Sequence, residues 1–140
     1  MPTEPHQPLK IVILAAGEEA GADKEPILLQ DLGERKVVDY VLQNARQFAA
    51  PQDIYIVIGC GADEMRAHLG EGYQYVCQEK QLGTGHAVLQ LKTRFQDFHG
   101  DLLILYGDTP LFRPDSIRGL LCRHRLRKAH LTLLTAIVDQ

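Results

Sequence analysis

The sequence predicts a three-layer α/β domain built on a mainly parallel sheet, and two observations lead to this prediction. Apolar runs of strand length alternate with segments whose apolar residues recur every three or four positions. Glycine, or a Gly-Asp pair, stands close behind four of the expected strands. Because strands that alternate with helices are joined by right-handed crossovers, we expect parallel strands with helices on both faces of the sheet.

The strands are expected where the apolar runs lie. Four runs have the continuous apolar pattern of strands buried on both faces, and they extend from Lys10 to Ala16, Asp53 to Gly59, Asp101 to Gly107 and Leu131 to Val138. A further strand is expected from Tyr73 to Cys77. No helix or strand is expected after Val138, so the sheet is expected to be unfinished, with an exposed edge that favours self-association or instability.

Helices are expected between these strands. Apolar residues line one face from Val37 to Phe48 and from Ile117 to His124, and less cleanly from Ala87 to Phe95. A short helix is expected from Asp63 to Leu69. The basic cluster Arg123 to Lys128 falls at a helix end, where cations complement the helix dipole, so we interpret it as a solvated helix terminus.

Composition limits the classes of function. The chain has 140 residues, 45% of them hydrophobic, and a formal net charge of −3, which favours a globular domain and gives no reason to expect nucleic acid as a partner. No run approaches the roughly 20 apolar residues of a membrane span. Residues 1–8 contain three prolines and read as a disordered leader before a domain at 9–140. Three scattered cysteines favour a reducing compartment over a disulfide framework, and hence the cytoplasm.

Small residues end the first expected strand. Leu14, Ala15, Ala16 and Gly17 would let a flat ligand such as a nucleobase lie against the backbone. The alternative is a tight strand-to-loop turn, for which glycine is the usual residue. No GxGxxG pattern follows, so the sequence does not support a dinucleotide-binding fingerprint.

The segment QLGTGHA, Gln81 to Ala87, is the sharpest local signal. Thr84 is expected to be a helix N-cap, with Gly83 leaving clearance for a ligand; a plain helix start is the alternative. Gln78 carries an amide that both donates and accepts, which suits a pyrimidine edge. His86 by itself is interpreted as a packed or solvent-facing histidine.

Asp108 follows the strand that ends at Gly107. A carboxylate in this place can hold Mg²⁺ against phosphates, because Mg²⁺ takes one or two carboxylates together with phosphate oxygens. A turn aspartate ahead of Pro110 is the alternative.

Taken in order, LAAG, IGCG, Gln78, QLGTGHA and LYGDTPL resemble the nucleotidyltransferase domain of N-acetylglucosamine-1-phosphate uridylyltransferases. The resemblance runs from about Leu9 to the end of the chain. It implies a Rossmann-like nucleotidyltransferase fold, UTP as donor, and Mg²⁺. It also implies attack by N-acetylglucosamine 1-phosphate on the α-phosphate, which gives UDP-N-acetylglucosamine and pyrophosphate.

The resemblance also assigns roles to residues of this sequence. It implies that Leu14 to Gly17 cradle the uracil with their backbone and that Gln78 reads its edge. It places Gly83 and Thr84 against the base and ribose, Tyr106 and Gly107 on the sugar side, and Asp108 on the metal.

The phosphate loop departs from the family. Where the family has GxGTR and then a Pro-Lys pair, this chain has Gly17 followed by an acidic stretch and Pro26-Ile27. Four acids, Glu18, Glu19, Asp23 and Glu25, and one base, Lys24, give the loop a formal charge of −4 + 1 = −3. Such a loop repels a triphosphate unless metal or Lys24 intervenes, so Lys24 is the candidate catalytic cation.

The family's acceptor-sugar region and second metal ligand also have no match. Two hypotheses follow. The chain is the nucleotide-binding portion of a sugar-nucleotide transferase, inactive by itself. Alternatively, it is a catalytically inactive relative that serves as a nucleotide-binding, regulatory or interaction module.

Overall fold

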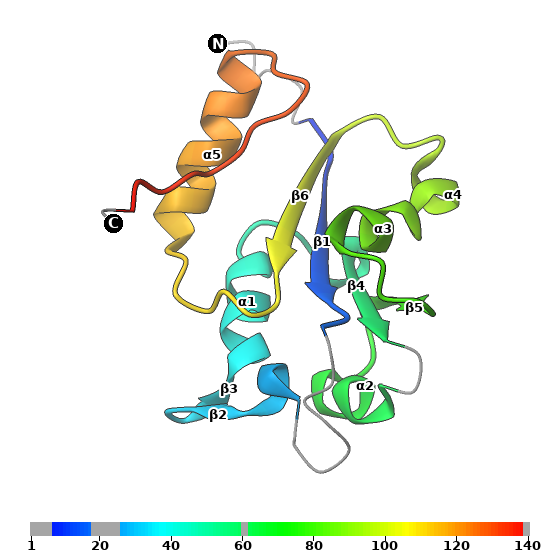
Figure 1. The fold of residues 1–140 in the computed structure, drawn as a ribbon. Coiled ribbons are helices and arrows are strands. Elements are labelled where there is room, and N and C mark those ends of the chain that lie inside the picture. Colours follow the sequence, from blue (N-terminus) through cyan, green and yellow to red (C-terminus); the bar gives the residue numbers. More distant parts are fainter. Residues whose placement is uncertain (1–6, 18–25, 60–61, 139–140) are drawn as a thin grey trace.

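A computed structural model describes residues 7–17, 26–59 and 62–138. Its centre is a sheet of four parallel strands in the order β5-β4-β1-β6 (Figure 1). The strands are β1 (Leu9–Ala15), β4 (Ile54–Gly59), β5 (Gln74–Gln78) and β6 (Asp101–Tyr106). The sequence prediction of a parallel sheet is confirmed for these four strands.

Short helices and one small hairpin connect the strands. The helices are α1 (Val37–Ala45), α2 (Asp63–Leu69), α3 (Thr84–Leu89), α4 (Lys92–Phe95) and α5 (Pro114–Leu126), with single 3₁₀ turns η1 (Ile27–Leu29) and η2 (Pro51–Asp53). The hairpin pairs β2 (Asp31–Leu32) with β3 (Arg35–Lys36). The helix expected from Ala87 to Phe95 is therefore two pieces, which begin earlier, at Thr84, and break at Gln90-Leu91.

Hydrophobic cores lie on both faces of the sheet, so the domain has three layers. On one face, isoleucines of β1 and β4 pack with residues of α1, α2 and α5, among them Val38, Met65 and Ile117. On the other face, Val12 and Val57 pack with Ala87 of α3 and with Leu91. Burying a side chain of this size contributes about 1.5–3 kcal/mol, so the continuous apolar runs specify the central strands.

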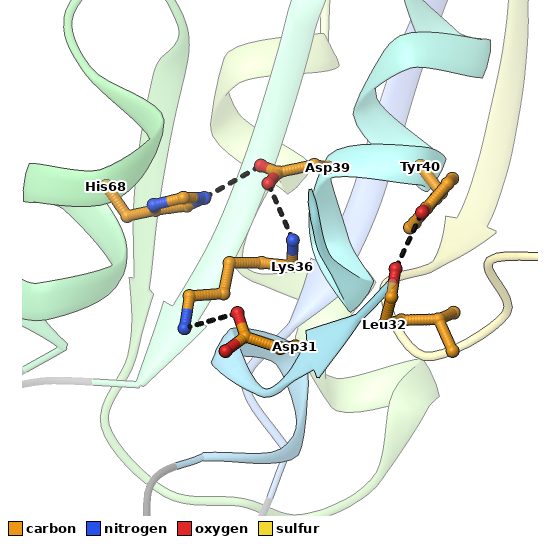
Figure 2. Close-up of polar contacts among 6 residues, drawn as sticks. All are labelled: Asp31, Leu32, Lys36, Asp39, Tyr40 and His68. Carbon is orange, nitrogen blue, oxygen red and sulfur yellow. Dashed lines mark hydrogen bonds and ion pairs between the residues drawn. The ribbon is translucent and has the colours of Figure 1, made fainter. Parts of the chain in front are cut away.

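A polar network joins the hairpin, α1 and α2 (Figure 2). Asp39 accepts a hydrogen bond from the backbone N–H of Lys36 at 2.9 Å and contacts Nε2 of His68 at 2.7 Å. The Lys36 ammonium pairs with Asp31 at 3.0 Å, and Tyr40 donates its hydroxyl to the carbonyl of Leu32. These contacts fix the start of α1 and hold it against α2.

The prediction of a strand from Leu131 to Val138 is wrong. These residues form neither helix nor strand, and Leu131 and Ile137 are 74% and 99% exposed. The segment runs back beside α5 (Figure 1), where Thr132 lies 2.8 Å from His124. Apolar composition makes a strand only where a neighbouring strand pairs with it, and no strand of the described residues does so here.

Two smaller expectations also need correction. The basic cluster at the end of α5 is not wholly solvated, because Arg125 donates Nε–H to Asp101, a 6%-exposed carboxylate, at 2.7 Å. Cys77 is disulfide-bonded, whereas Cys122 is free, so the expectation of cysteines without a disulfide is wrong. Among the described residues, no helix is long and apolar enough to cross a membrane.

Candidate nucleotide site

The predicted site residues that the structure describes lie at one end of the sheet, where the four parallel strands end. Strand register places Leu14 beside both Val57 and Tyr106, and it places Gly59 beside Gln78. The segments that follow these strands therefore leave the sheet at the same edge. Ligands of open α/β sheets bind at this carboxyl edge.

Gly107 joins the ends of β1 and β6. Its N–H donates to the carbonyl oxygen of Leu14 at 2.9 Å. A Cβ added to Gly107 would lie 3.0 Å from that oxygen and 3.3 Å from the side chain of Leu28. This close approach favours a residue without a side chain, and the hydrogen bond links the end of β1 to the residue that follows β6.

Gln78, the last residue of β5, is 3% exposed and points toward the start of α3. Its amide nitrogen donates to the carbonyl of Gly83 at 3.3 Å and lies 2.9 Å from Nδ1 of His86. The structure thus brings Gln78 and Gly83, two of the predicted site residues, into contact. The sequence does not predict the contact between Gln78 and His86, because nothing in it marks a contact between residues eight positions apart across a loop.

Gly83, and not Thr84, is the N-cap of α3, so the expectation that Thr84 caps this helix is wrong. Gly83 has φ of 97° and ψ of 176°, a conformation open in practice only to glycine. Thr84 is the first helical residue and is exposed. Gly85 has open space around its Cα, so its backbone does not require glycine.

A second contact links the residues after β1 to the loop that precedes α3. The amide nitrogen of Gln81 donates to the carbonyl oxygen of Gly17 at 3.1 Å. Gly17 and Gln81 are 64 positions apart, so this contact is set by the fold and has no local sequence signal. It brings the LAAG and QLGTGHA segments to the same place.

Asp108 is exposed and follows β6 in a turn. The N–H and the hydroxyl of Thr109 both donate to the carbonyl of Tyr106, at 3.3 and 2.9 Å, and fix this turn. Tyr106 is itself 47% exposed. No group of three His, Cys, Asp or Glu residues that could hold a metal is found within the described residues.

Lys24 and the acids of the phosphate loop lie outside the described residues, and so do Cys60 and Gly61 of the IGCG segment. A hollow of about 470 Å³ lies elsewhere, along α1, and is lined by Arg35, Asp39, Leu42, Gln43 and Arg46. None of the predicted site residues lines it.

Comparison with known proteins identifies the family. The MobA-like NTP transferase domain matches residues 11–136. The chain belongs to this family. The bifunctional protein GlmU of Synechococcus sp. (strain CC9311) is 40% identical to the chain over 134 residues, 94% of this chain and 29% of that protein. GlmU of Koribacter versatilis is 39% identical over 127 residues, 89% and 27% of the two chains. The chain spans less than a third of these relatives.

Solved structures share the fold of this MobA-like NTP transferase domain. Rv0371c of Mycobacterium tuberculosis H37Rv superposes with a TM-score of 0.62 at 23% identity, covering 83% of this chain and 59% of that one. The mannose-1-phosphate geranyltransferase of Thermus thermophilus gives a TM-score of 0.71 at 16% identity, covering 87% and 38%. The CMP:2-keto-3-deoxy-manno-octonic acid synthetase complexed with CTP gives 0.62 at 21% identity, covering 86% and 48%. The predicted Rossmann-like nucleotidyltransferase fold is confirmed.

Proposed function

We propose that this MobA-like NTP transferase domain binds UTP at the carboxyl edge of its sheet, as the nucleotide-binding portion, residues 9–140, of a sugar-nucleotide transferase. The reaction is transfer of UMP from UTP to N-acetylglucosamine 1-phosphate, which gives UDP-N-acetylglucosamine and pyrophosphate. The observation that carries the proposal is the buried amide of Gln78, held by Gly83 and His86 where the strands end. The 40% identity to a GlmU protein supports uridine as the nucleoside.

The base would lie between the end of β1 and the loop before α3. Gly17 and Gln81 are in contact there, and the backbone of Leu14 to Gly17 forms one side. The other side consists of Gly83 and Thr84, which lack large side chains beside Gln78. A flat uracil fits such a site because backbone and small residues let it approach closely.

The phosphates would extend toward Asp108, which would hold Mg²⁺. One exposed carboxylate suits Mg²⁺, because this ion fills its remaining positions with phosphate oxygens and water. Bound there, the ion would neutralise charge on the transferring phosphoryl group, the main requirement of this chemistry. Tyr106 and Gly107 would shape the sugar side, and Lys24 would supply a second positive charge.

One observation favours a second function, nucleotide binding without turnover. The loop between Gly17 and Pro26 carries four acids and one lysine. Repulsion between this loop and a triphosphate would destabilise the transition state, in which negative charge develops, more than it destabilises the metal-bound ground state. Such repulsion would slow turnover more than it weakens nucleotide binding. The domain would then act as a nucleotide-binding regulatory or interaction module.

Calorimetric titration with UTP and Mg²⁺, beside ATP, tests the proposal. Gln78→Ala and Asp108→Ala should each weaken UTP binding about tenfold, the effect of one lost hydrogen bond or charge contact. Gln74→Ala, at the other end of β5, and Asp115→Ala, on α5, are matched controls that should bind UTP normally. Unchanged affinity in both test variants would exclude this site. Pyrophosphate release with N-acetylglucosamine 1-phosphate, assayed on a longer natural chain that includes the acceptor-sugar region, then separates the transferase from the non-catalytic module.

A further inference from the structure

Gln78 is the most buried polar side chain at the carboxyl edge, and its amide nitrogen has two partners. The nitrogen lies 3.3 Å from the carbonyl oxygen of Gly83 and 2.9 Å from Nδ1 of His86. A carbonyl oxygen only accepts hydrogen bonds, so the Gln78 atom that faces Gly83 must be the nitrogen and not the oxygen. Chemistry therefore fixes the orientation of this amide.

Both hydrogens of the Gln78 amide are used by these two contacts, since a primary amide has two. Its oxygen Oε1 has no hydrogen-bond partner among the described residues. Every fully buried side-chain nitrogen or oxygen of those residues has a partner, so Oε1 is not fully buried. Oε1 is therefore the part of Gln78 that remains for a ligand. In this orientation Gln78 accepts a hydrogen bond from a base and donates none.

His86 can hold the Gln78 amide in this orientation only in one tautomer. Nδ1 must accept from Gln78, so the ring proton belongs on Nε2. The amide nitrogen of Gln90 lies 3.2 Å from Nε2, but it has a second acceptor, the backbone carbonyl of His86, also at 3.2 Å. Because a neutral imidazole accepts at one nitrogen only, the shorter contact, with Gln78, takes that role.

We infer that His86 is a positioning residue that turns the carbonyl oxygen of Gln78 toward the nucleobase and thereby makes the site select uracil over cytosine. Uracil carries an N–H donor at N3, which Oε1 can accept. In the same pose cytosine presents a ring-nitrogen lone pair, and two acceptors facing each other repel. The inference rests on the proposed uridine nucleotide site.

The test compares UTP and CTP binding to three variants by calorimetry in the presence of Mg²⁺. His86→Leu removes the acceptor and should weaken UTP binding about tenfold while lowering the UTP-to-CTP preference by a similar factor. His86→Asn should stay within about threefold of the parent, because its side-chain oxygen can replace Nδ1. Gln90→Ala should bind both nucleotides as the parent chain does.

The outcomes separate the two claims. If His86→Leu keeps the parent's affinity and preference, or if His86→Asn is as impaired as His86→Leu, the role of His86 is refuted. If the parent chain itself fails to bind UTP, the proposed function fails. Nitrogen-15 NMR of the parent chain then still tests the orientation: it should show His86 protonated at Nε2 and unprotonated at Nδ1, and the reverse tautomer would overturn the inference.

Discussion

At the scale of single residues, two glycines in one motif have different reasons to be there. Gly83 has φ of 97° and its carbonyl accepts a hydrogen bond from Gln78. Gly85 lies within α3, and a Cβ there would meet open space. The first glycine is thus required by its backbone conformation, and the second is not required by the fold.

Alanine substitutions should separate these two glycines. Gly83→Ala should lower the free energy of unfolding by about 1–3 kcal/mol, because the left-handed extended conformation is strained for any residue with a Cβ. Gly85→Ala should raise it by about 0.5–1 kcal/mol, because alanine favours a helix over glycine. Urea denaturation monitored by circular dichroism measures both values. Equal destabilisation by the two changes would contradict this account.

At the scale of elements, charged contacts hold the helices to the sheet. Asp101 begins β6, is 6% exposed, and receives the Nε–H of Arg125 from the far end of α5 at 2.7 Å. Asp39 likewise joins the start of α1 to α2 through His68. Both acids lie in part inside the protein, where loss of a partner leaves a desolvated charge.

Arg125→Ala should lower the free energy of unfolding by about 1–3 kcal/mol, because the buried Asp101 carboxylate loses its closest donor. Arg118→Ala is the matched control: its partner Asp115 is 92% exposed, and surface pairs contribute about 0–1 kcal/mol. Thermal and urea unfolding of both variants compare the effects. An equal free energy of unfolding in the two variants would show that the pair between Arg125 and Asp101 does not stabilise the domain.

Asp39→Ala should also destabilise the domain, by about 1–2 kcal/mol, because Asp39 satisfies the backbone N–H of Lys36 ahead of α1 (Figure 2). Asp31→Ala removes a carboxylate that is 77% exposed and should change stability by less than about 0.5 kcal/mol. Hydrogen exchange followed by mass spectrometry should show faster exchange in α1 and α2 for the first variant only. Faster exchange in both variants would argue against a special role for Asp39.

At the scale of the whole molecule, the edge strand β6 exposes apolar side chains. Leu102, Ile104 and Tyr106 of β6 are 41%, 41% and 47% exposed. No strand of the described residues pairs with the outer side of β6, although Leu131 to Val138 has strand-forming composition. Exposed sheet edges with apolar side chains promote association between chains.

Self-association is therefore expected, as the sequence predicted. Sedimentation velocity should show species larger than the 15.7 kDa monomer as the concentration increases. Ile104→Lys should reduce this association, because a charge on an edge strand opposes pairing with another chain. Monomers at every concentration, for the parent chain and the variant alike, would refute the expectation.

The sequence predicts the central strands, because these depend on the burial of apolar residues. It does not predict the contacts that depend on neighbours brought together by the fold. The runs that became β1, β4 and β6 were recognisable because their central residues are apolar on both faces. The run from Leu131 to Val138 has the same composition, yet strand formation also needs a pairing partner that composition does not reveal. The motif marks Gln78 and Gly83 as candidate site residues. The contacts of Gln81 with Gly17 and of His86 with Gln78 are created only by the fold.

The measurement that tests the central claim most directly is the calorimetric titration of this domain with UTP, beside ATP, in the presence of Mg²⁺. The account predicts saturable binding of UTP in preference to ATP, and about tenfold weaker binding after Gln78→Ala, with Gln74→Ala unaffected. Absence of UTP binding, or binding that Gln78→Ala leaves unchanged, would contradict the claim that the carboxyl edge of this sheet is a uridine nucleotide site.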